Sequence, residues 1–450
     1  MNKIIIASIF LTSVIGSAQI DSTAIKIPFE NMDMAWQNGS DRRSSSLLTT
    51  KYFTGSVMID ANYTHSFNNP NDNTVVGSTA LARNNEMQLS SANLGGEFNY
   101  EGARAKIMLQ FGTRSTVIPR NDYSVYRGQY QLDNVYRYLS EAYAGYHFNK
   151  WYGINVDAGM FMSYIGLNSY YQVENWEYQA SFTSDNTPWF FNGVRVQIFP
   201  TKKLKFEAWI INGWQSYGKF NSMPGIGGNI TWSPNDALKL LTNDYYGTDA
   251  AGIPERKRFH SDNSLLVRYY NEPKASGVSR MAFSSTVDVG FETGGGVRGF
   301  NGNAMRPSQY FLSGMVYNRI WFNRNKLACT VGGGYMTNPG RYLVLYPTGD
   351  ASPLPNPNNP TQTAGTHPFS ANPGDKFKGF DYSANFDVMP NESITFRIEF
   401  VHREASVPYF AGAGGVTSPT GYTTATLPAD WKPDLVKMEN RIILAVLFRI

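Results

Sequence analysis

The chain has few of the residues from which enzymes build metal and nucleophile sites. It contains one cysteine and five histidines in 450 residues. A single thiol excludes an intramolecular disulfide and a thiolate metal cluster, and no HExxH spacing is present. Cys329 falls in an apolar strand pattern and is expected to be a small apolar side chain. We therefore predict a protein that is not an enzyme and has no cofactor, no metal site and no catalytic residues.

One short run has the residue types of a serine hydrolase. His260, Ser261 and Asp262 follow one another directly. Neighbouring residues of an extended chain point to opposite sides, so this run cannot form a catalytic triad by itself. We interpret it as a polar cluster in a loop.

Charged residues and long apolar runs are also scarce. Charged residues make up 16% of the chain, against about 25% in an average soluble domain. The net charge is +4 and no Lys/Arg run occurs, so no nucleic-acid partner is expected. Beyond the N-terminus, the longest apolar run is Ile442–Phe448, far shorter than the ~18 residues of a membrane helix.

The N-terminus has the form of a secretory signal. Lys3 precedes the apolar run Ile4–Ile15, and the small residues Gly16, Ser17 and Ala18 follow. We predict a Sec signal peptide over residues 1–18 that is cleaved after Ala18. A short N-terminal membrane anchor is the alternative, and the length of the run disfavours it. The polar segment 19–51 comes next and has no clear period.

From Tyr52 onward, apolar and polar residues alternate. In 103–112, for example, Ala105, Ile107, Leu109 and Phe111 share one face, and Arg104 and Lys106 lie on the other. Such alternation predicts half-buried strands, and a soluble sandwich or propeller could also use it. The expected strands are 52–65, 87–100, 103–112, 139–148, 153–162, 189–199, 204–211, 226–232, 237–243, 263–270, 278–291, 309–322, 326–336, 375–389, 393–402 and 436–450.

The connections between these strands distinguish the alternatives. Long polar loops alternate with short turns along the whole chain, as they do in outer-membrane barrels. The architecture of a sandwich or propeller does not require connections that alternate in length. We predict an all-β fold, a transmembrane antiparallel up-and-down β-barrel of about 16 strands, with 14–18 possible. It spans residues 52–450, with short periplasmic turns and long extracellular loops, and lies in the outer membrane.

Aromatic residues and the C-terminal strand support this orientation. Aromatic side chains beside the short turns predict a girdle at the membrane interface: Trp151, Tyr152, Trp232, Trp321, Phe322 and Phe448. Strand 436–450 ends in an apolar face and resembles the recognition signal read by the barrel-assembly machinery, although the last residue is Ile450 and not Phe. The expected partners are this machinery, outer-membrane lipid and lipopolysaccharide, and either further copies of the chain or another envelope protein.

The segment from about Leu139 to Asp249 resembles the OmpL-like β-barrel porin family. The resemblance is carried by Asp157–Phe161, Ser163–Gly166, Glu174-Asn175-Trp176 with Tyr178, Ser181–Thr183, Pro188, Gly193–Arg195 and Asn212–Trp214. Membership would imply an outer-membrane barrel with a pore, and it supplies no catalytic residues.

Charged residues on the inward faces of the strands are candidates for a water-filled lumen. Each one taken alone could merely solvate the wall. As a set, they argue for water inside, because unpaired buried charges are costly. Since both signs occur, we expect weak ion selectivity. The candidates are Asp60, Arg104, Lys106, Glu141, Asp157, Arg195, Lys205, Glu207, Asp288, Arg397 and Glu399, with Glu439 and Arg441 in the last strand.

The third long connection, 163–188, is the candidate constriction loop. In sixteen-stranded general porins the third loop folds inward, and by analogy Glu174, Asn175, Trp176, Glu177 and Tyr178 are expected to narrow the channel. A surface loop or a partner contact is the alternative. The predicted function is passive diffusion of small hydrophilic solutes. The alternative is a structural or accessory barrel with a plugged lumen that docks another envelope protein.

Overall fold

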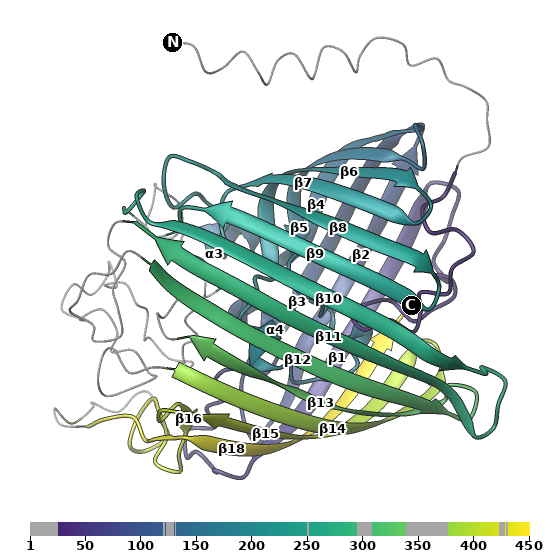
Figure 1. Ribbon diagram of the computed structural model, residues 1–450. Helices are drawn as coiled ribbons and strands as arrows, with labels where there is room; N and C mark the ends of the chain where they lie inside the picture. Colours follow the sequence, from purple (N-terminus) through teal and green to yellow (C-terminus); the bar gives the residue numbers. More distant parts are fainter. Residues whose placement is uncertain are drawn as a thin grey trace.

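The structure is a computed structural model, and it describes residues 26–119, 122, 130, 132–249, 252–294, 308–338, 377–422, 428 and 431–450. Sixteen antiparallel strands form one closed barrel (Figure 1). The predicted fold class and strand number are confirmed. The strands are β1 (Phe53–Ser66), β2 (Met87–Tyr100), β3 (Ala103–Phe111), β4 (Leu139–Phe148), β5 (Ile154–Met162), β6 (Phe190–Thr201), β7 (Leu204–Ile211), β8 (Gly225–Asn235), β9 (Leu238–Gly247), β10 (Lys257–Asn271), β11 (Val278–Thr293), β12 (Ser308–Phe322), β13 (Leu327–Asn338), β14 (Phe377–Asn391), β15 (Ile394–Ala405) and β18 (Met438–Arg449).

Each strand pairs with its neighbours in the chain, and the two ends of the sheet meet. β18 pairs with β15 on one side and with β1 on the other, with Ile59 opposite Phe448 and His65 opposite Ile442. Closure satisfies the backbone groups of both edges, which no open sheet could achieve in lipid. Two short strands outside the barrel, β16 (Phe410–Ala411) and β17 (Leu435–Val436), pair with each other in the long connection between β15 and β18.

One predicted boundary is wrong. Residues 257–262 were expected in a loop, but β10 begins at Lys257, so the His260-Ser261-Asp262 run belongs to a strand. His260 and Asp262 are buried, and Ser261 between them faces the other way. Phe259 is the only apolar residue of 257–262, so the stretch carries no apolar alternation by which the sequence could reveal a strand.

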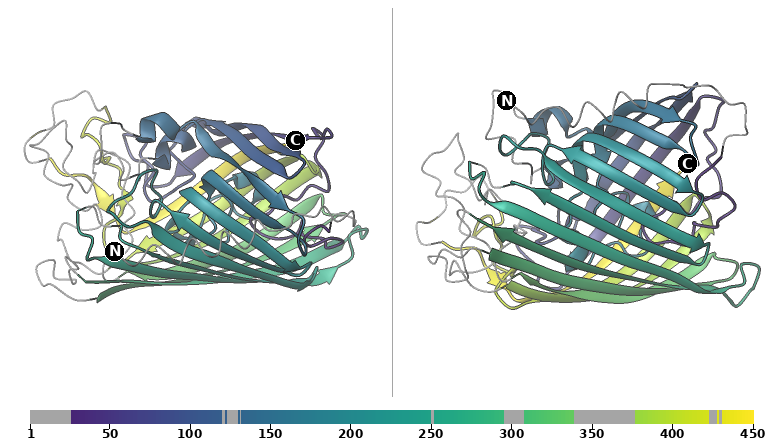
Figure 2. Two further views of the ribbon diagram at one scale, coloured as in Figure 1. Left: turned by 90° about the horizontal axis from the view of Figure 1, so that it is seen from above. Right: turned by 45° about the horizontal axis from the view of Figure 1, so that its top comes forward.

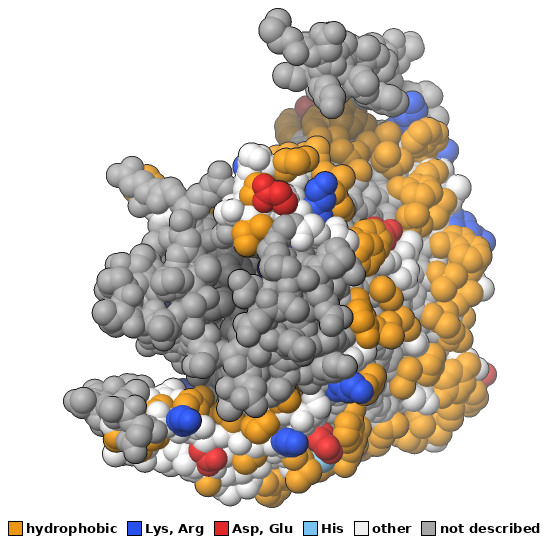
Figure 3. All heavy atoms as spheres, turned by 60° about the vertical axis from the view of Figure 1, so that its left-hand side comes forward, with side chains coloured by type: hydrophobic (Ala, Val, Ile, Leu, Met, Phe, Trp, Pro, Cys, Tyr) orange, Lys and Arg blue, Asp and Glu red, His pale blue; other side chains and the backbone are white. Residues whose placement is uncertain are grey.

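The outer face of the wall is apolar. Ile59, Ile107, Val194, Phe206 and Ile398 are among its exposed side chains. The residues that alternate with them point inward, because successive side chains of a strand point to opposite faces, and many are polar and buried, such as Asp60, Glu207 and Glu399. In Figure 3 apolar side chains cover much of the wall, and charged side chains lie near its rim. This is the surface pattern of a barrel that contacts lipid.

The two ends of the barrel differ. Short turns lie at one end, together with the C-terminus, and the long connections lie at the other (Figures 1 and 2). The turn between β2 and β3 has positive φ at Glu101 and Gly102, the geometry of a two-residue hairpin. The long connections contain the short helices α2 (Arg114–Val117), α3 (Leu132–Tyr136), α4 (Phe182–Asp185) and η3 (Gln172–Glu174). In the part of the chain that the structure describes, no helix is long and apolar enough to cross a membrane.

Two connections, 66–86 and 163–188, fill much of the barrel, and the N-terminal segment 26–51 adds its buried residues Trp36, Gln37 and Asn38. Buried residues from these segments pack with wall residues into interior clusters, such as Trp36 and Trp176 with Trp321 and Met389. The predicted signal peptide, 1–18, and nearly all of the Pro-rich connection 337–374 lie outside the described residues.

Candidate functional site

The connection 163–188 lies inside the barrel and is almost wholly buried. It contains η3 and α4, and Figure 1 shows α4 within the ring of strands. Its own polar residues shape it locally. The Ser181 side chain accepts a hydrogen bond from the Thr183 N–H and so caps α4, and the Asn175 side chain bonds to both the N–H and the C=O of Ser169.

Tyr178 fixes the middle of this loop to the wall at β1 and β15. Its hydroxyl donates to the Asp60 carboxylate over 2.8 Å, and its backbone N–H donates to the Glu399 carboxylate over 2.6 Å. The N–H of Gln179 donates to the other Glu399 oxygen over 2.7 Å. All these groups are buried, and burial raises the pKa of the Tyr178 hydroxyl well above its usual value. The phenol therefore stays a neutral donor.

Trp176 fixes the same loop to β12 and β14. Its carbonyl accepts hydrogen bonds from Arg319 at 3.2 Å and Asn385 at 2.7 Å. Its ring meets the Trp321 ring edge to face, with centroids 5.6 Å apart. The girdle prediction for Trp321 is therefore wrong, because this side chain is buried inside the barrel. Trp321 and Phe322 are adjacent in β12, so only one of them can face lipid.

The other three constriction candidates also lie inside the barrel. Glu174 forms an ion pair with Arg449, and the Asn175 carbonyl accepts a hydrogen bond from Arg397. Glu177 is fully buried and accepts hydrogen bonds from Asn38 and Asn168. Burial raises the pKa of Glu177, and the two amide donors offset part of this increase. Hence all five candidates are close together, and their bonds hold the loop in place.

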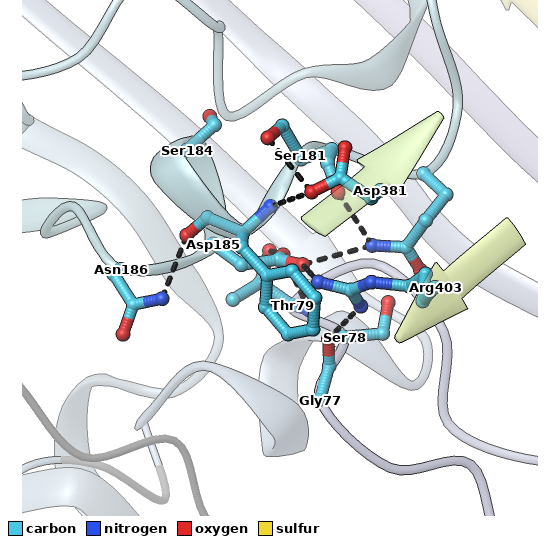
Figure 4. Close-up of polar contacts among 12 residues, drawn as sticks. Gly77, Ser78, Thr79, Ser181, Ser184, Asp185, Asn186, Asp381 and Arg403 are labelled. Carbon is cyan, nitrogen blue, oxygen red and sulfur yellow. Dashed lines mark hydrogen bonds and ion pairs between the residues drawn. The ribbon is translucent and has the colours of Figure 1, made fainter. Parts of the chain in front are cut away.

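A second network holds α4 and the connection 66–86 against β14 and β15 (Figure 4). Asp185 accepts hydrogen bonds from the Thr79 hydroxyl at 2.7 Å and from the Arg403 guanidinium at 3.0 Å. Asp381 accepts from the Ser181 hydroxyl at 3.0 Å and from the Phe182 N–H at 2.8 Å. Burial raises the pKa of Asp185, and the positive charge of Arg403 offsets part of that effect. These bonds join three distant parts of the chain.

The N-terminal segment crosses the short-turn end of the barrel. The Trp36 indole donates to the Asp236 carbonyl, and the Trp36 carbonyl accepts from the Trp176 indole over 3.1 Å. Asp33 pairs with Arg268 at 2.7 Å and Arg280 at 2.9 Å. In Figure 1 this segment, in dark purple, lies at the end that carries the C-terminus. It therefore supports the interior loop from the side of the short turns.

A cavity of about 350 Å³ remains between the interior loop and the opposite wall. Its loop side is formed by residues of 162–170 with Pro188 and Trp189, and its floor by Asn38 and Gly39. Its wall side comes from β4 to β9: Glu141, Arg195, Gln197, Lys205, Glu207, Trp209, Asn229, Thr231, Lys239 and Leu241. Lys205 and Lys239 lie next to short turns, whereas Glu141 and Met162 lie where β4 and β5 meet long connections. The cavity thus extends along much of the wall.

The lumen-lining candidates are turned to the interior and most are paired. Lys106 lies 2.7 Å from Glu141, Arg195 lies 2.9 Å and Arg104 3.4 Å from Asp157, and Lys205 lies 2.7 Å from Glu207. Those on the other wall, Asp60, Arg397 and Glu399, contact the interior loop. Asp288, Glu439 and Arg441 are also buried, and Glu439 pairs with Arg441. Only part of the predicted set therefore lines the cavity.

The remaining girdle candidates lie at the short-turn end. Trp151 and Trp232 are exposed, and Tyr152, Phe322 and Phe448 are partly exposed. We propose that these five residues form an aromatic girdle at the membrane interface.

Several residues of the site do not stand out in the sequence. Trp36 and Asn38 come from a segment without a period, and only the presence of a lone tryptophan among polar residues could have singled out the segment. Lys239, Arg319, Asp387 and Arg403 lie on inward faces, so strict alternation along their strands would have found them. Among the described residues, no group of three or more His, Cys, Asp or Glu side chains is placed to hold a metal ion.

Solved structures with similar architecture are outer-membrane proteins. OmpT of Vibrio cholerae shares 8% identity over 90% of this chain and 100% of its own, with a TM-score of 0.47. The channel DcaP of Acinetobacter baumannii shares 11% identity over 90% and 100%, with a TM-score of 0.46. OprB of Pseudomonas putida shares 10% identity over 89% and 94%, with a TM-score of 0.48. Similarity at this level says nothing of a solute.

No curated protein matches the chain. A family model described as "Putative beta-barrel porin-2, OmpL-like" matches residues 52–429, which is most of the chain and all but the last strand of the barrel. The chain therefore belongs to this OmpL-like porin family and is an outer-membrane barrel channel.

Proposed function

We propose that this channel allows passive diffusion of small hydrophilic solutes. The observation that carries the proposal is the cavity between the interior loop and strands β4 to β9. Charged and polar side chains from both the loop and the wall line this cavity. Water solvates such groups, whereas an apolar ligand would leave them without hydrogen-bond partners. A polar passage of this kind favours solutes that keep part of their hydration.

The asymmetry of the interior supports the same proposal. On the side of β1 and β12 to β15, Tyr178, Trp176 and Asp185 bond the loop directly to the wall. On the side of β4 to β9, the loop contacts the wall at separate points, where Tyr164 donates to the Asp244 carbonyl and Tyr171 donates to Glu141, and a cavity stays open beside these contacts. We infer that solutes pass along β4 to β9 and that the bonds on the opposite side keep the loop in place. The five candidates from Glu174 to Tyr178 would then set the width of the passage by positioning the loop.

Swelling of proteoliposomes in sugars of graded size tests this function. A diffusion channel admits a pentose faster than a disaccharide and excludes a larger oligosaccharide. Thr231 lines the cavity, so Thr231→Trp should slow swelling severalfold by narrowing the passage. Ile230, its neighbour in β8, faces outward, so Ile230→Trp is the matched control and should leave the rates unchanged.

The same experiment separates the channel from a plugged accessory barrel. If the folded protein admits no sugar at all, passive diffusion is refuted. Swelling that Thr231→Trp leaves intact would place the route elsewhere in the barrel.

A further inference from the structure

We propose that the cavity favours small anions over cations and that Lys239 is the residue that sets this preference. The inference rests on the proposed diffusion function and names the charge class of the solute. The cavity lining contains three cationic side chains, Arg195, Lys205 and Lys239, and two acidic ones, Glu141 and Glu207. Their pairing decides which charge is left to act on a passing ion.

Both acidic side chains of the lining are already compensated. Glu207 accepts hydrogen bonds from Lys205 at 2.7 Å, from the Gln197 amide at 2.7 Å and from the Trp209 indole at 2.9 Å. Glu141 lies 2.7 Å from Lys106 and accepts from the Tyr171 hydroxyl over 3.0 Å. A carboxylate whose charge is already paired with a nearby ammonium group in this way attracts a hydrated cation only weakly.

Lys239 has no such compensation. Its Nζ lies 3.2 Å from the side-chain oxygen of Gln37, a neutral carboxamide. Within the part of the chain that the structure describes, no carboxylate lies within ion-pair distance of it, and Lys205 repels it. A partly buried cation with only a neutral partner gains most from an anion that comes close. The lining therefore carries an excess of positive charge, since Arg195 pairs with Asp157 and Lys205 with Glu207, and Lys239 is the lining cation that has no carboxylate partner among the described residues.

The position of Lys239 suits control of passage. It is the second residue of β9, next to the short turn after β8. Gln37, its partner, precedes Asn38 and Gly39, which form the floor of the cavity. A charged side chain on the lining of a polar passage acts on the ions that pass beside it, as charged groups do in ion channels. The N-terminal segment thus helps to hold the selecting charge in place.

The reversal potential of single channels in a planar bilayer with a tenfold KCl gradient tests the inference. The wild-type protein should pass chloride roughly 2-fold more readily than potassium, in keeping with the effect of one unpaired charge in a pore. Lys239→Gln should bring the permeability ratio to about one, and Lys239→Glu should make the channel prefer potassium. Lys239→Arg keeps the charge and should keep the preference for chloride.

Lys203 supplies a matched control. It lies in the exposed turn between β6 and β7, at the same end of the barrel and outside the cavity lining. Lys203→Gln removes the same charge and should leave the ratio unchanged. Equal shifts from both variants would mean that general surface charge, and not Lys239, sets the preference.

The outcomes separate this inference from the function beneath it. If folded protein gives no conductance, the proposed diffusion function fails and the inference fails with it. If the channel conducts and Lys239→Gln leaves the ratio unchanged, or the wild-type protein prefers potassium, the inference is overturned and the diffusion function stands. A detergent gel shows that the compared variants are folded, because a folded barrel migrates differently from the unfolded chain until the sample is heated. The temperature at which this difference disappears should be the same for each variant.

Discussion

Asp387 holds two arginines inside the barrel. Its carboxylate lies 2.7 Å from Arg319 and 2.7 Å from Arg397, and all three side chains are buried. Each arginine also donates to a backbone carbonyl of the interior loop, at Trp176 or Asn175. Asp387 therefore compensates the charges that fix the loop.

Replacing this carboxylate should destabilise the folded barrel. We expect Asp387→Asn to lower the free energy of unfolding by about 3–5 kcal/mol, because two buried guanidinium groups lose their counter-ion. Urea unfolding in lipid vesicles measures the change. Glu97→Gln is the control, since its carboxylate is half exposed and its pairing with Lys106 at 3.4 Å should be worth no more than about 1 kcal/mol. A loss as small as that of the control would show that water inside the barrel compensates the arginines.

Asp72 links the long connection between β1 and β2 to the one between β15 and β18. One of its oxygens accepts hydrogen bonds from the N–H groups of Val416 and Thr417, each at 2.7 Å. Burial alone would raise the pKa of this carboxyl, but these bonds outweigh it and lower the pKa below its ordinary value of 3.8. The contact between the two connections thus depends on the ionised form.

The lowered pKa of Asp72 determines how the contact between the two connections depends on pH. Because the folded-state pKa is lowered, the stabilisation is complete above pH 3.8 and is lost as the pH falls through the folded-state value. Protection of the Val416 and Thr417 amides from hydrogen exchange, normalised to intrinsic rates, should fall over that range. In Asp72→Asn it should be about 10-fold lower already at neutral pH, the equivalent of one charge-assisted hydrogen bond. Glu86→Gln, in the same connection, should change neither amide, and full protection in Asp72→Asn would contradict the assignment.

At the scale of elements, different residues of the connection 163–188 bond it to the wall and line the cavity. Trp176 and Tyr178 of this connection bond to β1, β12, β14 and β15, while its residues 163–170 line the cavity. The wall does not need these bonds to close, since each strand is fully paired with its neighbours. The loop can therefore be shortened without opening the sheet.

Deleting Tyr170–Thr183 should raise single-channel conductance by at least about 2-fold, because the passage widens toward the full lumen. Planar-bilayer recordings measure the effect on protein shown to be folded. Unchanged conductance would mean that this loop does not limit flow, and a lower conductance would mean that another segment collapses into the space.

At the scale of the whole molecule, closure depends on strands from opposite ends of the sequence. β18 completes the wall by pairing with β1, and the interior joins residues as far apart as Trp36 with Trp176 and Asp60 with Tyr178. These pairings bring the first described segment, the third long connection and the last strand into one structure. A barrel of this kind has no partly closed state that satisfies all its backbone groups.

The wall of the barrel can be predicted from the amino-acid sequence alone. Period-2 alternation and the succession of short and long connections were sufficient for a sixteen-stranded barrel with its inward charges, because the two faces of every strand meet different solvents. Local patterns do not reveal the strand at His260–Asp262, where both faces are polar, and closeness to a short turn does not tell whether Trp321 faces lipid or the interior.

The contents of the barrel interior, in contrast, become visible only in the folded chain. The side of the wall to which the loop is bonded depends on contacts such as Tyr178 with Asp60 and Trp176 with Arg319, which are far apart in sequence and have no period. For the same reason, the pairing of Glu207 with Lys205, and the neutral partner that leaves Lys239 uncompensated, are visible only once the chain is folded. Alternation says which side chains face inward, and it cannot say which of them meet.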